Sequence, residues 1–338
     1  MCKNNYMLKA VRFVAVWAAV LLCLLAATAC NKQPNPDETE QQNPSAVQLP
    51  DSPSDQDEPQ PTKTIANVED MVWIEGVLSI EKLEFSNTIY GVVAYQVLCH
   101  AADGTQLAME IILPDDYTDA ATDYPVLFYC PQIGWSLDEL AMLYARYGYI
   151  VIRPYKRGYG QSEGMRDLGG AGDISDAQTL LHICDSAGFL QNKKMFLLGS
   201  SEGATIALRL FAQDDARRFE GCAVVDVITD MHAYGEMRGE SIMELQHRLI
   251  GNTYEEAPEE YELRSPLYFY ERLDRPMLLL CYTQSPFISV ESIDLFYERL
   301  CTVNPDVTYH KLDALSADFS HPGHSYLMSW LGDFNEND

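Results

Sequence analysis

The stretch that decides the fold is Met195-Phe196-Leu197-Leu198-Gly199-Ser200-Ser201-Glu202-Gly203-Ala204. Its first part has the apolar character of a buried strand, and the Ala- and Leu-rich residues after it are typical of a helix. Between them lies a G-x-S-x-G pattern, in which a serine occupies a strained turn from strand to helix. A side chain at either flanking glycine would collide with neighbouring backbone. The pattern predicts that the Ser201 hydroxyl is presented as a nucleophile at the carboxyl edge of a sheet.

Strand-like and helix-like patterns alternate on both sides of this turn, from about residue 66 to the C-terminus. The strand-like runs are mostly continuous apolar stretches, as in parallel strands buried on both faces. Asp103-Gly104 is a hairpin signal between the first two runs. The eight predicted strands are 90–100, 105–113, 125–130, 148–153, 194–198, 222–227, 276–282 and 307–312. The alternation predicts an α/β fold, a mostly parallel eight-stranded sheet with helices on both faces and an antiparallel hairpin at one edge.

Several further motifs follow one another along the chain: the hairpin Asp103-Gly104-Thr105-Gln106-Leu107, the loop Arg157-Gly158-Tyr159-Gly160-Gln161-Ser162-Glu163-Gly164, the segments Ile250-Gly251-Asn252 and Tyr261-Glu262-Leu263-Arg264-Ser265-Pro266-Leu267, and the strand Arg275-Pro276-Met277-Leu278-Leu279-Leu280. Together with the turn at Ser201, and in this order, they resemble the α/β-hydrolase fold and, within it, the prolyl-oligopeptidase-like serine hydrolases. The loop is similar to the family's RGYGxSxG motif. The resemblance runs from about Tyr90 to the C-terminus. It implies a serine hydrolase for a small ester or peptide substrate, working without a cofactor.

The resemblance places the catalytic base, a histidine, in the loop after the last strand. Three histidines lie that late in the chain: His310, His321 and His324. His310 falls inside the strand pattern, which favours a structural role. We expect His321, at the point where loop becomes helix, to be the base, with His324 as the alternative about one turn further on.

The triad acid departs from the family pattern. The family places an Asp after the penultimate strand, and here Ser285 occupies that position, with no carboxylate between Asp274 and Glu291. A hydroxyl can orient a histidine but cannot stabilise an imidazolium as a carboxylate does. Some α/β-hydrolases carry the acid one strand earlier, which indicates Asp226 at the end of that strand. Asp230 in the next loop remains an alternative.

The family's HGG motif, which forms part of the oxyanion hole, is also altered, to Cys130-Pro131-Gln132-Ile133-Gly134. Any residue except Pro can donate a backbone amide, so Gln132 or Ile133 can serve beside the amide of Glu202. We expect the Glu202 side chain to lie at a surface or at the edge of a cleft. Residues 231–264, which include several Met, are predicted to form a small helical cap insertion.

The first 65 residues are predicted to contain a targeting signal followed by a tether. Lys3, Lys9 and Arg12 precede an apolar run over 13–29, which ends in small residues before Cys30. The order is that of a secretory signal, and it resembles the lipobox of a bacterial lipoprotein. The resemblance implies a signal peptide over 1–29, lipidation of Cys30, and export to a bacterial cell membrane. Residues 30–65, rich in Pro, Gln and Asn, are predicted to be a disordered tether before a hydrolase domain at 66–338.

The composition excludes some classes of function. With 23 Lys and Arg against 50 Asp and Glu, the formal net charge is -27, which disfavours nucleic-acid partners. No Cys/His spacing for a metal and no phosphate loop is present, so neither metal nor cofactor is expected. Two hypotheses remain. One is a lipid-anchored serine hydrolase, and the other is a degenerate hydrolase that binds a ligand or partner without turnover.

Overall fold

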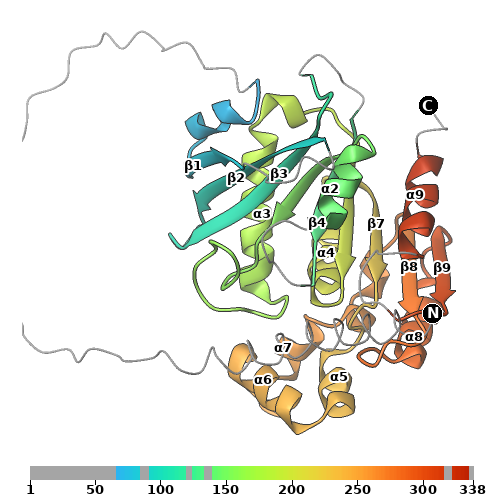
Figure 1. The fold of residues 1–338 in the computed structure, drawn as a ribbon. Coiled ribbons are helices and arrows are strands. Elements are labelled where there is room, and N and C mark those ends of the chain that lie inside the picture. Colours follow the sequence, from blue (N-terminus) through green and yellow to red (C-terminus); the bar gives the residue numbers. More distant parts are fainter. Residues whose placement is uncertain (1–65, 84–90, 119–123, 133–138, 316–321, 335–338) are drawn as a thin grey trace, which may run out of the picture. The chain divides into compact units, whose positions relative to one another are not determined.

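A nine-stranded sheet organises the chain in this computed structural model, which describes residues 66–83, 91–118, 124–132, 139–315 and 322–334 (Figure 1). The strands are β1 Val77–Lys82, β2 Val92–His100, β3 Gln106–Pro114, β4 Val126–Cys130, β5 Ile150–Pro154, β6 Met195–Ser200, β7 Phe219–Val225, β8 Met277–Tyr282 and β9 Val307–Leu312. Their order in the sheet is β1-β2-β3-β5-β4-β6-β7-β8-β9. In this order β4 is the central strand, and β6 lies beside it.

The sheet is antiparallel at one side and parallel from β5 to β9. β1 pairs with β2, β2 with β3 and β3 with β5 in antiparallel fashion, and the remaining neighbours are parallel. The α/β prediction and the opening hairpin are confirmed, and Gly104 occupies the tip of that hairpin with a φ of 83°. The predicted count of eight strands is wrong by one. The extra strand, β1, is an edge strand with only two partly buried apolar side chains, so it lacks the apolar run of a buried strand.

Helices cover both faces of the sheet. The helices are α2 Glu139–Arg146, α3 Ala171–Asp185, α4 Glu202–Ala212, α5 Met231–Arg238, α6 Glu240–Ile250, α7 Pro258–Glu262, α8 Val290–Leu300 and α9 Gly323–Asp333, with short 3-10 turns at Glu69–Trp73, Gly188–Leu190, Pro266–Tyr268 and Tyr270–Arg272. Buried side chains of α3, α4 and α8 belong to one core cluster, and those of α2 and α9 belong to another. The two clusters are the two faces of the sheet.

Strand β6 shows how the sequence builds these two cores. Met195 and Leu197 belong to the cluster under α3, α4 and α8, whereas Phe196 and Leu198 belong to the cluster under α2 and α9. Successive side chains of a strand point to opposite faces, so a continuous apolar run fills both cores at once. Because this run is buried on both faces, it fixes the position of β6 in the sheet, and with it the position of the turn that follows β6.

The segment between β7 and β8 folds into α5, α6 and α7, which lie together at the bottom of the view in Figure 1. Residues 231–264 therefore contain the helices predicted for the insertion. Only five residues separate the end of β7 from the start of α5, so this insertion starts at the carboxyl edge of the parallel strands. In open α/β sheets ligands bind at that edge.

Candidate active site

The turn between β6 and α4 holds Ser201 in a strained backbone conformation. Its φ is 52° and its ψ is -117°, a region that residues with a Cβ rarely adopt. A Cβ on Gly199 would lie 2.6 Å from the Cα of Ala204, and one on Gly203 would lie 2.0 Å from the carbonyl oxygen of Cys130. Both glycines are therefore required by close backbone approaches, as the sequence pattern predicts.

Hydrogen bonds to the backbone keep this turn in place. The amide of Ser201 donates to the carbonyl of Val225 at 3.0 Å, and the carbonyl of Ser201 accepts from the amide of Ala204 at 3.0 Å. Ser201 is only 8% exposed. The packed ends of β6 and β7 thus hold Ser201 in its strained conformation.

Asp226 occupies the equivalent place at the end of β7. Ser200 pairs with Val225 in the parallel ladder, so Asp226 follows β7 at the level of Ser201. It also has a positive φ, 47°, and is 1% exposed. One carboxylate oxygen, Oδ1, accepts the amide of Tyr282 at 2.9 Å. The carboxylate thereby contacts the end of β8, the strand after which the family pattern has its acid.

The two alternatives for the acid have other partners. Asp230 is the N-cap of α5, where Oδ1 accepts the amide of Ala233 at 2.9 Å and Oδ2 accepts the hydroxyl of Tyr268 at 3.3 Å. The Oγ of Ser285 accepts the amide of Phe287 at 3.4 Å. Capping accounts for Asp230, and a local turn accounts for Ser285. Asp226, in contrast, is buried at a strand end, and its role as the triad acid stays a prediction.

Two histidines are candidates for the catalytic base. His321 lies outside the described residues. Two positions later, the amide of Gly323 donates to the buried hydroxyl of Tyr282 at 3.1 Å, which fastens the start of α9 to the end of β8. His324 stacks on the ring of Tyr144 in α2, with 5.7 Å between ring centroids. The structure thus gives His324 a packing role between α2 and α9.

The expected donors to an oxyanion differ in their availability. Glu202 is the first residue of α4, so its amide lies at a helix N-terminus beside Ser201. The amide of Gln132, in contrast, donates to the Oγ of Ser200 at 2.9 Å. That the Gln132 amide serves as a donor stays a prediction, and it requires this hydrogen bond to be exchanged before the amide binds substrate. Ile133, the other residue considered, lies outside the described residues.

The Glu202 side chain is buried and paired, which corrects the expectation of a surface carboxylate. Its Oε1 lies 3.2 Å from Nζ of Lys156, and its Oε2 lies 2.6 Å from Nη2 of Arg166. Burial by itself would raise the pKa of Glu202, but the two cations lower it below its ordinary value. The residue after Ser201 is thus a charged carboxylate held between two cations.

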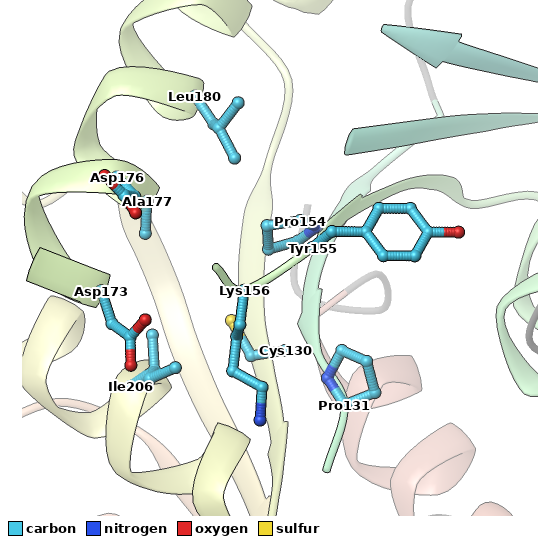
Figure 2. A pocket seen from close by; sticks show the side chains of 10 residues that line it. All are labelled: Cys130, Pro131, Pro154, Tyr155, Lys156, Asp173, Asp176, Ala177, Leu180 and Ile206. Carbon is cyan, nitrogen blue, oxygen red and sulfur yellow. The ribbon is translucent and has the colours of Figure 1, made fainter. Parts of the chain in front are cut away.

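Asp173 of α3 is a second buried carboxylate, close enough to Glu202 for the two charges to interact. Its Oδ2 accepts the amide of Gly169 at 2.7 Å, and the side chain is buried. Burial, aided by the charge of Glu202, raises the pKa of Asp173 to about 7. Figure 2 shows Asp173 and Lys156 on a small cavity of ≈ 20 Å³, room for about one water molecule. Neither Ser201 nor Asp226 lines this cavity, and its volume is too small for a substrate.

The sequence analysis missed Lys156, Arg166 and Asp173. Lys156 and Arg166 flank the glycine-rich loop after β5, and a cation at the carboxyl end of a parallel strand is a signal that could have indicated the first of them. Nothing local to Asp173 indicates that it lies close to Glu202. No group of His, Cys, Asp and Glu among the described residues is arranged to hold a metal ion. The helices in that part of the chain include none long and apolar enough to cross a membrane.

Comparison with known proteins agrees with this architecture. Residues 135–284 match the model of the prolyl oligopeptidase family. The chain is 25% identical over 169 residues to the uncharacterized peptidase YtmA of Bacillus subtilis, which covers 50% of this chain and 65% of that protein. The chain therefore spans somewhat less than two thirds of the length of this relative.

Solved structures share the fold at low identity. The esterase Pf2001 of Pyrococcus furiosus aligns with a TM-score of 0.56 and 17% identity over 75% of this chain and 96% of its own. A puromycin hydrolase gives a TM-score of 0.59 and 19% identity over 74% and 39%. An acylaminoacyl peptidase gives 0.58 and 16% over 77% and 42%. These likenesses establish the α/β-hydrolase fold.

Proposed function

We propose that this chain, a serine hydrolase of the α/β-hydrolase fold with likeness to the prolyl oligopeptidase family, cleaves carboxylic esters or short acyl-peptide bonds through an acyl-enzyme at Ser201. The observation that carries the proposal is the pair of strained residues at adjacent strand ends. Ser201 and Asp226 both have positive φ and both are buried at the carboxyl edge of the sheet. Strain of this kind persists only where the surrounding structure enforces it, and it clusters at active sites.

In the proposed mechanism the hydroxyl of Ser201 attacks the substrate carbonyl while His321 accepts its proton. Asp226 orients His321 and stabilises the imidazolium, as the acid of a triad does. The amide of Glu202 donates to the oxyanion, and a second amide from Gln132 joins it once that amide leaves the Oγ of Ser200. His321 then returns its proton to the leaving group. Water, activated by the same histidine, releases the acyl group and restores Ser201.

The proposal includes an envelope location. The supporting features are the basic start, the apolar run over 13–29 and Cys30, all of them outside the described residues. A lipid on Cys30 and the stretch 30–65 would hold the catalytic unit off a bacterial membrane.

A second candidate, a degenerate hydrolase that only binds a ligand or partner, is favoured by one observation. The amide of Gln132 is occupied by Ser200, so half of the expected oxyanion hole is closed in this structure. The intact turn around Ser201 argues against it, because a protein without catalysis has no chemical reason to retain that strain.

Active-site labelling separates the two candidates. The full-length protein, in detergent micelles, is treated with a fluorescent fluorophosphonate, beside Ser201→Ala and Ser200→Ala. We expect labelling of the wild type and of Ser200→Ala, and none of Ser201→Ala. A folded wild-type protein that takes up no label would overturn the hydrolase proposal and favour the binding protein.

A further inference from the structure

The side chain of Lys156 contacts both the loop after β4 and the start of α4, the helix that follows Ser201. It follows β5, and its Nζ donates to the carbonyl oxygen of Gln132 at 2.7 Å. The same Nζ lies 3.2 Å from Oε1 of Glu202. One ammonium group therefore contacts the loop after β4 and the first residue of α4, the two places from which oxyanion donors are expected.

The position of Lys156 suits it to hold these segments rather than to meet substrate. Its side chain is only 9% exposed, and it extends along the cavity wall beside Cys130 in Figure 2. Its Nζ also lies 5.3 Å from the centre of the Tyr159 ring. A cation with an anion, a carbonyl and an aromatic face around it has little freedom to move.

The backbone at Gln132 is held from both ends. Ser200 accepts its amide, and Lys156 donates to its carbonyl. The amide and the carbonyl of Gln132 belong to the two planar peptide units that meet at its Cα, so Ser200 holds one of these planes and Lys156 holds the other. The loop after β4 already lies against Gly203, where a Cβ would be 2.0 Å from the carbonyl oxygen of Cys130. Small rotations of this loop would therefore change how its amides face Ser201.

We propose that Lys156 is a positioning residue, whose bridge between the Gln132 carbonyl and the Glu202 carboxylate aligns the backbone amides that stabilise the oxyanion. The proposal rests on the proposed serine hydrolase function. Lys156 acts through the backbone and does not contact the reacting atoms. Its contribution appears in the transition state, where negative charge develops on the substrate oxygen, and hardly at all in binding of the ground state.

Arg166 provides a matched control. It pairs with the same carboxylate, Oε2 of Glu202, at 2.6 Å, and its guanidinium lies 5.3 Å from the Tyr159 ring centre, as Nζ of Lys156 does. None of its described contacts involves Gln132. Lys156→Met and Arg166→Met therefore both remove one cation from Glu202, but only the first removes the link to the loop after β4.

The experiment measures kcat and KM of the full-length enzyme for p-nitrophenyl butyrate, with sites counted by fluorophosphonate titration. Loss of one oxyanion donor costs about 10²–10³ in kcat, so misalignment is expected to lower kcat about 10- to 100-fold in Lys156→Met. KM should stay within about 3-fold. Arg166→Met should lower kcat less than about 5-fold, and Lys156→Arg, which keeps a charged donor, should recover most of the loss.

A second readout distinguishes alignment from a general loss of structure. Phenylboronic acid forms a tetrahedral adduct with an active serine, and its affinity should fall in Lys156→Met by about the same factor as kcat. Lys156→Gln, uncharged and one bond shorter, serves if the Met variant does not fold, with a loss in the same direction. Equal losses in Lys156→Met and Arg166→Met, or a changed KM with unchanged kcat, would overturn the role of Lys156. Wild-type protein without label or turnover would overturn the proposed function itself, and this role with it.

Discussion

The carboxyl ends of β6 and β8 lie on either side of β7 in one parallel sheet, yet they offer very different chemistry. After β6 comes Ser201, with a strained backbone, two required glycines and a charged, buried neighbour. After β8 comes a turn in which Ser285 accepts a backbone amide and no carboxylate occurs before Glu291. Between them, at the end of β7, Asp226 accepts the amide of Tyr282, so a carboxylate of the neighbouring strand contacts the end of β8. If Asp226 is the triad acid, as we propose, the acid has moved to the neighbouring strand while it still contacts the end of β8.

The largest expected effect concerns the base that completes the β6 end. His321→Ala should lower kcat by about 10⁴-fold or more, because a triad histidine and its serine act as one unit. His324→Ala is the matched control. It should leave kcat within about 5-fold and cost about 1 kcal/mol of stability through the lost stack on Tyr144. Steady-state kinetics and thermal melts check both, and the reverse ranking would make His324 the base.

The next effect tests whether the triad acid comes from the end of β7 or from the loop after β8. Asp226→Asn should lower kcat by about 10³–10⁴-fold while the protein remains folded, since a neutral amide can keep the contact with Tyr282 but cannot stabilise an imidazolium. Adding Ser285→Asp restores a carboxylate at the family position and should regain about 10-fold or more. Unchanged kcat in Asp226→Asn would place the acid elsewhere and break the comparison.

A smaller effect concerns Asp173, the buried carboxylate that interacts with Glu202 after β6. The pKa of Asp173 is raised from 3.8 to about 7 by burial and by Glu202, so the folded protein binds this proton more tightly than the unfolded chain. The resulting stabilisation is complete below about pH 4 and is lost as the pH rises through 7. Compared with Asp173→Asn, the wild type should lose roughly 2–4 kcal/mol between pH 4 and pH 8. Urea unfolding across that range measures it, and parallel curves for the two proteins would contradict it.

The smallest effect concerns the carboxylate that only caps a helix. Asp230→Ala removes the acceptor for the amide of Ala233 and should cost about 1 kcal/mol, a fall of roughly 2–4 °C in Tm. Its kcat should stay within about 2-fold of wild type. A loss comparable to that of Asp226→Asn would show that the acid lies in the loop after β7 instead of at the strand end.

The parts that could be predicted from the sequence are those encoded by neighbouring residues. The turn around Ser201 depends on five consecutive residues, and the hairpin at Gly104 on two. β1 could not be predicted because it is held by pairing with β2, while its own side chains are largely exposed. The links of Lys156 span 24 residues to Gln132, and the link of Asp226 to Tyr282 spans 56. No local pattern encodes such contacts, since they exist only once the strands are in order.

The buried cysteines affect whether the protein can refold after it has been unfolded by heat. Cys99, Cys130, Cys184, Cys222 and Cys281 are free and buried in the core strands and in α3, and burial raises the pKa of each thiol. While folded, these thiols are poor nucleophiles and resist oxidation. Heating exposes them together, beside the exposed Cys301. Any disulfide that air oxidation then forms is foreign to the fold and blocks refolding, so we expect thermal inactivation to be irreversible without a reductant and largely reversible with one.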